Sequence, residues 1–308
     1  MNHTSGPAKL SGRCFILFNY LDFMPEYPDI TIYIERLKAI VLGQPIENIR
    51  FANPFFLHSV DPQIDSIKNE RVQGFERIGK RIVFVFPNEY FLVLHLMIAG
   101  RLFWKQKRFK IPPKRGLAAL DFANGSLLIT EAGTKKRASM YLAKGLANLE
   151  YFDAGGLEIF TASFDNFHNR LQAENHTLKR ALTDPRLFSG IGNAYSDEIL
   201  HCAKLSPVLQ TKRMSLQQIK QLHEATISTL EKWTKILREE TGDGFPENVT
   251  AFRKDMAVHG KFGKPCPVCG KQIQRIRFAS NETNYCPNCQ TEGKLLADRS
   301  LSRLLKKD

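Results

Sequence analysis

Apolar residues recur every three or four positions between residues 28 and 43, a spacing that predicts an amphipathic helix. Asp29 and Thr31 are candidate caps at its start, and Gly43 is a candidate stop. From residue 46 to about residue 160, short apolar or alternating runs replace this pattern, separated by turns that contain Pro, Asn and Gly. The runs are residues 81–86, 91–97, 118–122, 126–129 and 139–142. They predict an antiparallel β-sandwich or barrel, without the strand–helix alternation of a doubly wound sheet.

Helical spacing returns after Gly155 and Gly156 and predicts a mostly helical second half. The expected helices are residues 163–174, 177–183, 193–203 and 215–240. A breaker cluster at residues 242–246 ends this half, and a short cysteine-rich segment and a basic tail follow it. We therefore predict an α+β protein. Its parts are an extension at 1–23, a β domain at 24–160, a helical domain at 161–245, a cysteine module at 246–290 and a tail at 291–308.

Composition narrows the class of protein. Of the 308 residues, 43% are hydrophobic and 24% are charged, which excludes wholesale disorder, collagen and a coiled coil. The most apolar stretch, residues 82–99, is interrupted by Pro87, Asn88, Glu89 and His95, so the sequence predicts no membrane span and no membrane partner. Lys and Arg number 44 against 31 Asp and Glu, and the net charge of +13 favours a polyanionic partner such as nucleic acid.

Four of the six cysteines, Cys266, Cys269, Cys286 and Cys289, have the spacing C-x2-C-x16-C-x2-C. Two such knuckles can complete a tetrahedral site with four thiolates, and a site filled by protein ligands is structural. We therefore predict one structural Zn²⁺, held at a β-hairpin that carries Lys271, Arg275 and Arg277. The alternative is two unrelated C-x-x-C pairs or redox dithiols. The cysteine usage indicates a reducing, cytoplasmic setting.

The first 23 residues form a separate question. Lys9 and Arg13 precede a short apolar stretch at residues 14–21, which imitates a secretory signal, but no small-residue cleavage site follows. We interpret the segment as a disordered extension, or as sequence upstream of the true start. Met24 offers that alternative start.

Two further segments suit a polyanion. In FSGIGNAYSDEIL, residues 188–200, Gly190 and Gly192 lead into a helix that begins near Asn193, and the free N–H groups of a helix start can bind a phosphate. Packing alone also explains many such glycine turns. The run RLFWKQKRFKIPPKR at residues 101–115 interleaves basic and aromatic residues without an acid, which suits a surface that follows a nucleic-acid backbone. A solvated loop with inward aromatic rings is the plainer alternative.

Four of these features together resemble the formamidopyrimidine-DNA glycosylase / endonuclease VIII family. They are MPEYPDI at residues 24–30, GKR at residues 79–81, GIGNAYSDEIL at residues 190–200 and the four-cysteine hairpin, and they cover roughly residues 24–289. The resemblance implies an N-terminal helix and β-sandwich, a helix–two-turn–helix domain and a C-terminal zinc hairpin. It also implies a bifunctional DNA glycosylase/AP lyase of base excision repair, which acts on double-stranded DNA with damaged bases or abasic sites.

The resemblance assigns roles to individual residues. Pro25 would be the nucleophile that forms a Schiff base, Glu26 the general acid/base, and Lys80 an assistant in base loss or elimination, with Asp29 supporting the proline region. The proline nitrogen must be a free amine, so we expect translation to start at Met24 and this residue to be removed. The expected DNA contacts are His95, Ile98, Arg101, Arg137 and Asn193.

This sequence departs from the family pattern at two positions. Ala138 follows Arg137 where the family has a wedge phenylalanine, and Asn281 stands where the family has a hairpin arginine. These departures leave three properties open: which lesion is excised, whether the second elimination occurs, and which residue acts as the wedge. A non-catalytic protein that binds damaged DNA, and an unrelated zinc-ribbon protein, are the alternatives. We expect a monomer in the bacterial cytoplasm that works at the nucleoid.

Overall fold

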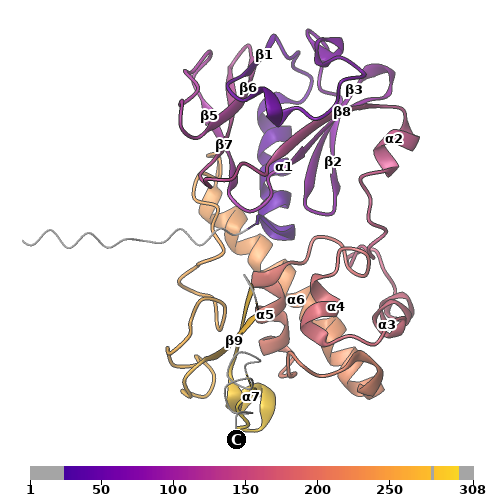
Figure 1. The fold of residues 1–308 in the computed structure, drawn as a ribbon, viewed down its shortest axis with the longest axis vertical. Coiled ribbons are helices and arrows are strands. Elements are labelled where there is room, and N and C mark those ends of the chain that lie inside the picture. The colour runs from indigo at the N-terminus through magenta and orange to yellow at the C-terminus, as the bar shows by residue number, and fades with distance from the viewer. Residues whose placement is uncertain (1–23, 279–280, 298–308) are drawn as a thin grey trace, which may run out of the picture.

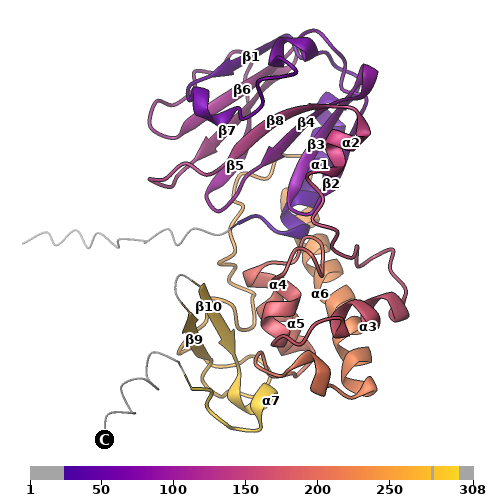
Figure 2. The same ribbon diagram turned by 45° about the vertical axis from the view of Figure 1, so that its right-hand side comes forward.

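The computed structural model describes residues 24–278 and 281–297, and the expected extension and more than half of the expected tail lie outside this part. A β domain that contains helix α1 (Tyr27–Val41) lies at one end of the molecule (Figure 1). A helical domain and a cysteine-bearing hairpin lie at the other end. Helices α1 and α6 (Leu216–Thr241) pack against each other where the two ends meet (Figure 2).

The β domain consists of two antiparallel sheets, ordered β1-β6-β7-β5 and β2-β3-β4-β8. The strands are β1 (Asn48–Phe51), β2 (Gly74–Ile78), β3 (Arg81–Phe86), β4 (Tyr90–His95), β5 (Gly100–Lys105), β6 (Gly116–Phe122), β7 (Gly125–Glu131) and β8 (Ser139–Lys144). The predicted sandwich is confirmed. The runs at residues 81–86, 91–97, 118–122, 126–129 and 139–142 correspond to β3, β4, β6, β7 and β8.

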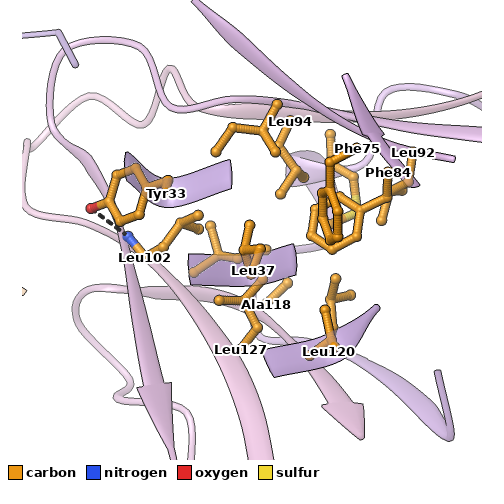
Figure 3. Close-up of a cluster of buried hydrophobic side chains, with 14 of the residues drawn as sticks. Tyr33, Leu37, Phe75, Phe84, Leu92, Leu94, Leu102, Ala118, Leu120 and Leu127 are labelled. Carbon is orange, nitrogen blue, oxygen red and sulfur yellow. Dashed lines mark hydrogen bonds between the residues drawn. The ribbon is translucent and has the colours of Figure 1, made fainter. Parts of the chain in front are cut away.

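One hydrophobic core joins the two sheets to helix α1. The helix contributes Tyr33 and Leu37, and both are fully buried (Figure 3). The Tyr33 hydroxyl accepts a hydrogen bond of 3.3 Å from the backbone N–H of Leu102, which satisfies the one polar atom of that ring inside the core. Burial of this apolar face of α1 fixes the helix start, and with it the residues that precede α1.

The helical domain begins after α2 (Leu146–Glu150) and contains the four predicted helices. They are α3 (Phe164–Gln172), α4 (Leu178–Thr183), α5 (Asn193–Cys202) and α6. Ser215 starts α6 with a capping box, in which its hydroxyl accepts from the Gln218 N–H and the Gln218 side chain accepts from the Ser215 N–H. Helix α5 is nearly all buried, because α4, α6 and the hairpin contact it on different sides.

The C-terminal hairpin pairs β9 (Gln274–Phe278) with β10 (Asn281–Tyr285), and α7 (Pro287–Thr291) follows. Gly270 has a φ of +75°, as expected for the turn after a C-x-x-C knuckle. Within the described residues, no helix is long and apolar enough to cross a membrane.

Candidate active site

Glu26 lies immediately before α1, and its carboxylate reaches into the helical domain. There it accepts hydrogen bonds from three backbone N–H groups at the start of α5: Gly192 at 2.7 Å, Ala194 at 2.8 Å and Tyr195 at 3.2 Å. The side chain is only 3% exposed. The sequence predicted free N–H groups for a phosphate at this helix start. Their acceptor, however, is a carboxylate of the protein itself, so these N–H groups are already satisfied.

Lys80 approaches the same point from the β domain. It occupies the second position of the two-residue turn between β2 and β3, and Gly79 before it has a φ of +59°. A Cβ atom on Gly192 would lie 2.6 Å from Glu26 Cδ and would also overlap the Lys80 ammonium. Gly192, which has no side chain, therefore lets both groups lie close against its backbone. Burial lowers the pKa of Lys80, while the nearby Glu26 carboxylate opposes this shift. A lowered pKa increases the neutral fraction of the amine.

Pro25 and Asp29 complete this group at the start of α1. Pro25 is buried and is bonded directly to Glu26. Asp29 Oδ2 accepts a 3.0 Å hydrogen bond from the Glu26 N–H, and Asp29 Oδ1 lies 3.5 Å from Arg253 Nη2. The structure thus brings together Pro25, Glu26, Lys80 and Asp29, which the sequence places in two segments 50 residues apart.

Asp29 gives the protein a pH-dependent stability. Its burial raises the pKa of the carboxyl from 3.8 to about 6, with the Arg253 cation opposing the shift. The folded state therefore holds this proton more tightly than the unfolded state. Its contribution is fully present below about pH 4 and is lost as the pH rises through about 6.

Asp29→Asn should remove this dependence. Between pH 7 and pH 4.5, the free energy of unfolding of the wild type should rise relative to that of the variant, by at most about 3 kcal/mol. Urea unfolding at a series of pH values would measure the difference. Parallel curves for the two proteins would show that Asp29 titrates normally.

His95 and Ile98 lie at the end of β4 and in the turn that follows it. His95 is opposite Arg81 on β3 and Ser139 on β8. Burial, with Arg81 and Lys80 nearby, lowers the pKa of His95 to about 4, so the ring is neutral at pH 7 and can hydrogen-bond a phosphate only as a neutral donor. Ile98 is half-buried in the turn. Gly100 after it allows close packing, because a Cβ there would lie 2.8 Å from Leu96 Cα.

Arg101 and Arg137 have different surroundings. Arg101 donates to three backbone carbonyls: Val249 at 2.7 Å, Gly100 at 2.6 Å and Ile98 at 3.3 Å. In this structure it thus holds the turn of Ile98 against the segment after α6. Arg137 is exposed, and only its backbone is fixed, because its N–H donates to both carboxylate oxygens of Glu131 at 3.0 and 2.9 Å. Of the two arginines, Arg137 presents its side chain to solvent.

Asn193 links α5 to the hairpin. Its Nδ2 donates a 3.0 Å hydrogen bond to the Glu282 carbonyl. The Glu282 carboxylate in turn lies 3.2 Å from Arg275 Nη1 and 3.5 Å from Arg277 Nε. Both hairpin arginines that could substitute for the missing family arginine are therefore paired with Glu282. Asn281 is the first residue of β10, opposite Phe278.

A cavity of about 350 Å³ opens beside Asp29. Its wall includes the charged side chains of Asp29, Glu240 and Arg253. The segment 245–249 after α6 also lines the cavity. Nothing in the local sequence pattern marks Arg253 or Glu240 as a site residue. Glu131 was not predicted either, although a lone acid at the end of the apolar strand SLLITE is a visible signal.

The four cysteines converge as predicted. Their Sγ atoms all lie within 4.8 Å of one another, with Cys269 and Cys286 at 3.4 Å and Cys266 and Cys289 at 3.9 Å. A tetrahedral Zn²⁺ with Zn–S bonds of about 2.3 Å places its sulfurs roughly 3.8 Å apart, so the donor set fits this metal. His201, near the end of α5, lies with its Nε2 3.3 Å from Cys266 Sγ. The site leaves no position for substrate and is structural.

Metal removal is expected to unfold the hairpin while the β domain remains folded, because thiolate ligation contributes folding free energy directly. Metal analysis should find one zinc per chain. Limited proteolysis after chelation should cut within residues 263–291, whereas residues 24–160 should stay protected. Cys286→Ser should reproduce this pattern without a chelator, and Cys202→Ser, outside the cluster, is the control. Metal-free protein with an intact hairpin would contradict a structural zinc.

Comparisons with known proteins agree with this architecture. Residues 24–135 match the formamidopyrimidine-DNA glycosylase N-terminal domain, residues 157–241 the H2TH domain of the same glycosylase, and residues 263–291 the zinc finger found in FPG and IleRS. The class is therefore that of helix–two-turn–helix proteins with a zinc finger.

Relatives define the family within that class. An uncharacterized formamidopyrimidine-DNA glycosylase-like protein of Mycobacterium tuberculosis is 42% identical over 151 residues, which cover 49% of this chain and 94% of the relative. The formamidopyrimidine-DNA glycosylase of Mycoplasma genitalium is 27% identical and is covered to 96%, over 87% of this chain. This chain belongs to the formamidopyrimidine-DNA glycosylase family.

Solved structures give the same result for the fold. The Lactococcus lactis Fpg in complex with DNA that contains an abasic site superimposes with a TM-score of 0.77 at 26% identity, over 86% of this chain and 99% of that chain. A MutM complex with DNA that contains carbocyclic 8-oxo-G has a TM-score of 0.75 at 26% identity, over 87% of this chain and all of that chain.

Proposed function

We propose that this protein is a bifunctional DNA glycosylase and AP lyase of base excision repair. The observation that carries the proposal is the position of Glu26. Its carboxylate is fixed by three N–H groups of α5, beside Pro25 in the chain and facing Lys80 across Gly192. A nucleophile, an acid/base group and a second amine thus meet at one point. The complexes of relatives with abasic-site and 8-oxo-G DNA support the choice of substrate.

The reaction begins at the Pro25 nitrogen once that nitrogen is a free secondary amine. It attacks C1′ of the damaged nucleotide, the bond from C1′ to the base breaks, and the base leaves with a proton supplied by an acid in the site. The nitrogen then loses its proton, the C1′–O4′ bond breaks as that oxygen takes up a proton, and an iminium ion forms between Pro25 and C1′. Loss of a C2′ proton to a base breaks the C3′–O bond and nicks the strand. Glu26 carries the proton transfers, and Lys80, whose pKa is lowered, assists them.

The chain start that this chemistry needs is also a proposal. The match to the formamidopyrimidine-DNA glycosylase N-terminal domain begins at Met24. This start supports a functional chain in which Met24 is the initiator and its removal exposes Pro25.

The cavity beside Asp29 is where we place the base of the extruded nucleotide. Its volume of about 350 Å³ is enough for one nucleobase, and its wall carries a carboxyl group, a guanidinium group and backbone that can pair with base edges. We place the DNA across the interface of the two halves, along His95, Ile98, Arg137 and Asn193. Arg101 supports this surface through the carbonyls that it holds.

The second candidate function is that of a non-catalytic DNA-binding protein with the same fold. Here Pro25 is an internal residue, and an amide nitrogen in a peptide bond is not a nucleophile. A chain that keeps residues 1–23 would then be a protein that binds damaged DNA and holds it without cutting it.

Glu26→Gln on the chain that starts at Met24 tests the proposal. The amide cannot donate and accept protons as a carboxyl does, so excision of a damaged base should fall by about 100- to 10,000-fold. Nicking of a preformed abasic site should fall less, because no base has to leave. Single-turnover cleavage of the two DNA substrates would measure both rates. A variant with unchanged excision would remove Glu26 from the chemistry, and no cleavage by the wild type would favour the non-catalytic binder.

A further inference from the structure

Arg77 touches all three segments that form the proposed catalytic centre, although it reaches none of the reacting groups. Its Nη1 donates to the Gly79 carbonyl at 2.7 Å, in the turn that carries Lys80. The same Nη1 donates to Ser189 Oγ at 3.1 Å, next to the glycine turn that leads to Gly192. Its guanidinium lies over the ring of Tyr27, 4.5 Å from the centroid, and Tyr27 follows Glu26 directly.

The other end of this arrangement is anchored in the helical domain. Arg77 Nη2 forms an ion pair with Glu158 Oε2, and the Ser189 hydroxyl donates to Glu158 Oε1. Glu158 therefore holds both the guanidinium and its serine partner. Arg77 is on β2 of the β domain, whereas Glu158 and Ser189 belong to the helical side, so the contacts cross the interface between the two halves.

Backbone contacts make this interface tight at the same place. The Tyr27 N–H donates to the Gly190 carbonyl at 2.9 Å. Gly190 has a φ of +79°, and a Cβ there would lie 3.1 Å from Tyr27 Cβ and 3.2 Å from Arg77 Nη1. A small movement of the guanidinium would therefore displace its contacts with Tyr27, the glycine turn and the Gly79–Lys80 turn at the same time.

We propose that Arg77 is a positioning residue that sets the distance of Lys80 from Glu26 by clamping the Gly79–Lys80 turn to Glu158 and Ser189. A guanidinium suits this role because its planar fork donates in several fixed directions, whereas an ammonium is a point charge. The proposal rests on the proposed function, since it concerns the same catalytic centre. It adds a residue outside the chemistry on which the geometry of that centre depends.

Arg77→Met tests the proposal, because it keeps a long side chain and removes every donor. Single-turnover nicking of abasic-site DNA should slow by about 10- to 100-fold, since a misplacement of about 1 Å can have an effect of that size. The dissociation constant for DNA with an uncleavable abasic analogue should stay within about twofold of the wild-type value. Arg77→Lys should recover part of the rate, because it retains the positive charge and one donor nitrogen.

The matched control is Arg238→Met. Arg238 forms a bidentate ion pair with Glu35, at 2.8 and 2.7 Å, and this pair also joins α6 to α1. It is remote from the Gly79–Lys80 turn in its contacts. Its loss should leave rate and binding within about twofold of wild type, as expected for an exposed pair of small energetic value. Circular dichroism would confirm that each variant is folded.

A second readout does not depend on catalysis. Pulse acetylation of the 308-residue protein, quantified by mass spectrometry, reports the accessibility of the Lys80 amine. Arg77→Met should increase Lys80 labelling several-fold, while Arg238→Met should not change it. Wild-type labelling and wild-type rates in Arg77→Met would overturn the proposal, as would equal losses in Arg238→Met. If the wild type never cuts DNA, the proposed function fails, and the labelling still decides the role of Arg77.

Discussion

Protein that starts at Met24 should form a borohydride-stable adduct with abasic-site DNA at least about 100-fold faster than the 308-residue chain. The reason is the state of the Pro25 nitrogen. In the long chain it is an amide whose lone pair is delocalised into the carbonyl. In the short chain, removal of Met24 leaves a secondary amine, and α-amines titrate near pH 8, so a useful neutral fraction exists at pH 7. Gel separation of reduced complexes would measure the two rates.

Lys80 makes a control necessary, because it is a second amine with a lowered pKa at the same point. Pro25→Gly on the short chain keeps an α-amine, and Lys80→Ala removes the side-chain amine. If Pro25 is the nucleophile, Lys80→Ala still traps DNA, although elimination slows. Equal trapping by the long chain, with its intact mass verified, would show that another group attacks the sugar.

Gly192→Ala should abolish most of the activity, with a fall in the single-turnover rate of at least about 100-fold. The backbone at Gly192, with φ −135° and ψ −155°, suits any residue, so conformational strain is not the reason. The added methyl group would lie 2.7 Å from Glu26 Oε1 and would overlap the Lys80 ammonium, so one of the two groups must move. The overlap should also lower the free energy of unfolding by about 1–3 kcal/mol.

Gly74→Ala is the matched control on β2, the strand that leads to the Lys80 turn. A Cβ there would lie 3.8 Å from Val85 Cβ, which is an ordinary contact. This variant should keep the wild-type rate and a melting temperature close to that of the wild type. An active Gly192→Ala protein would mean that Lys80 and Glu26 need not meet at this glycine.

The sequence predicted the elements whose signals are local. The apolar stripe of α1 and the apolar run of β3 were found, because each depends on neighbours a few residues away. Strand β5 was not predicted, because its basic and aromatic residues were interpreted as part of a surface that binds nucleic acid.

The sequence identified several residues of the candidate site but not the contacts between them. The start of α5 was identified as an anion site, yet its ligand is Glu26, 166 residues earlier in the chain, and no local pattern names such a partner. Arg101 was predicted to contact DNA, which stays a prediction, but its hydrogen bonds to three backbone carbonyls were not predicted, because they depend on the segment after α6 lying beside β5. Contacts of this kind depend on how the chain folds back, which spacing and composition do not encode.

The length of helix α5 fixes the distance between two contacts at its opposite ends. Its first turn holds Glu26, and its last turn places His201 against the zinc ligand Cys266, so both ends are engaged at once. The seven-residue separation of Ala194 and His201, at 1.5 Å per residue, sets these two points roughly 10 Å apart along the helix axis. Inserting one residue would rotate one end by about 100° relative to the other. Either the Glu26 carboxylate or the cysteine cluster would then lose its partner on α5, so the length of this helix is as constrained as the identity of the residues at its ends.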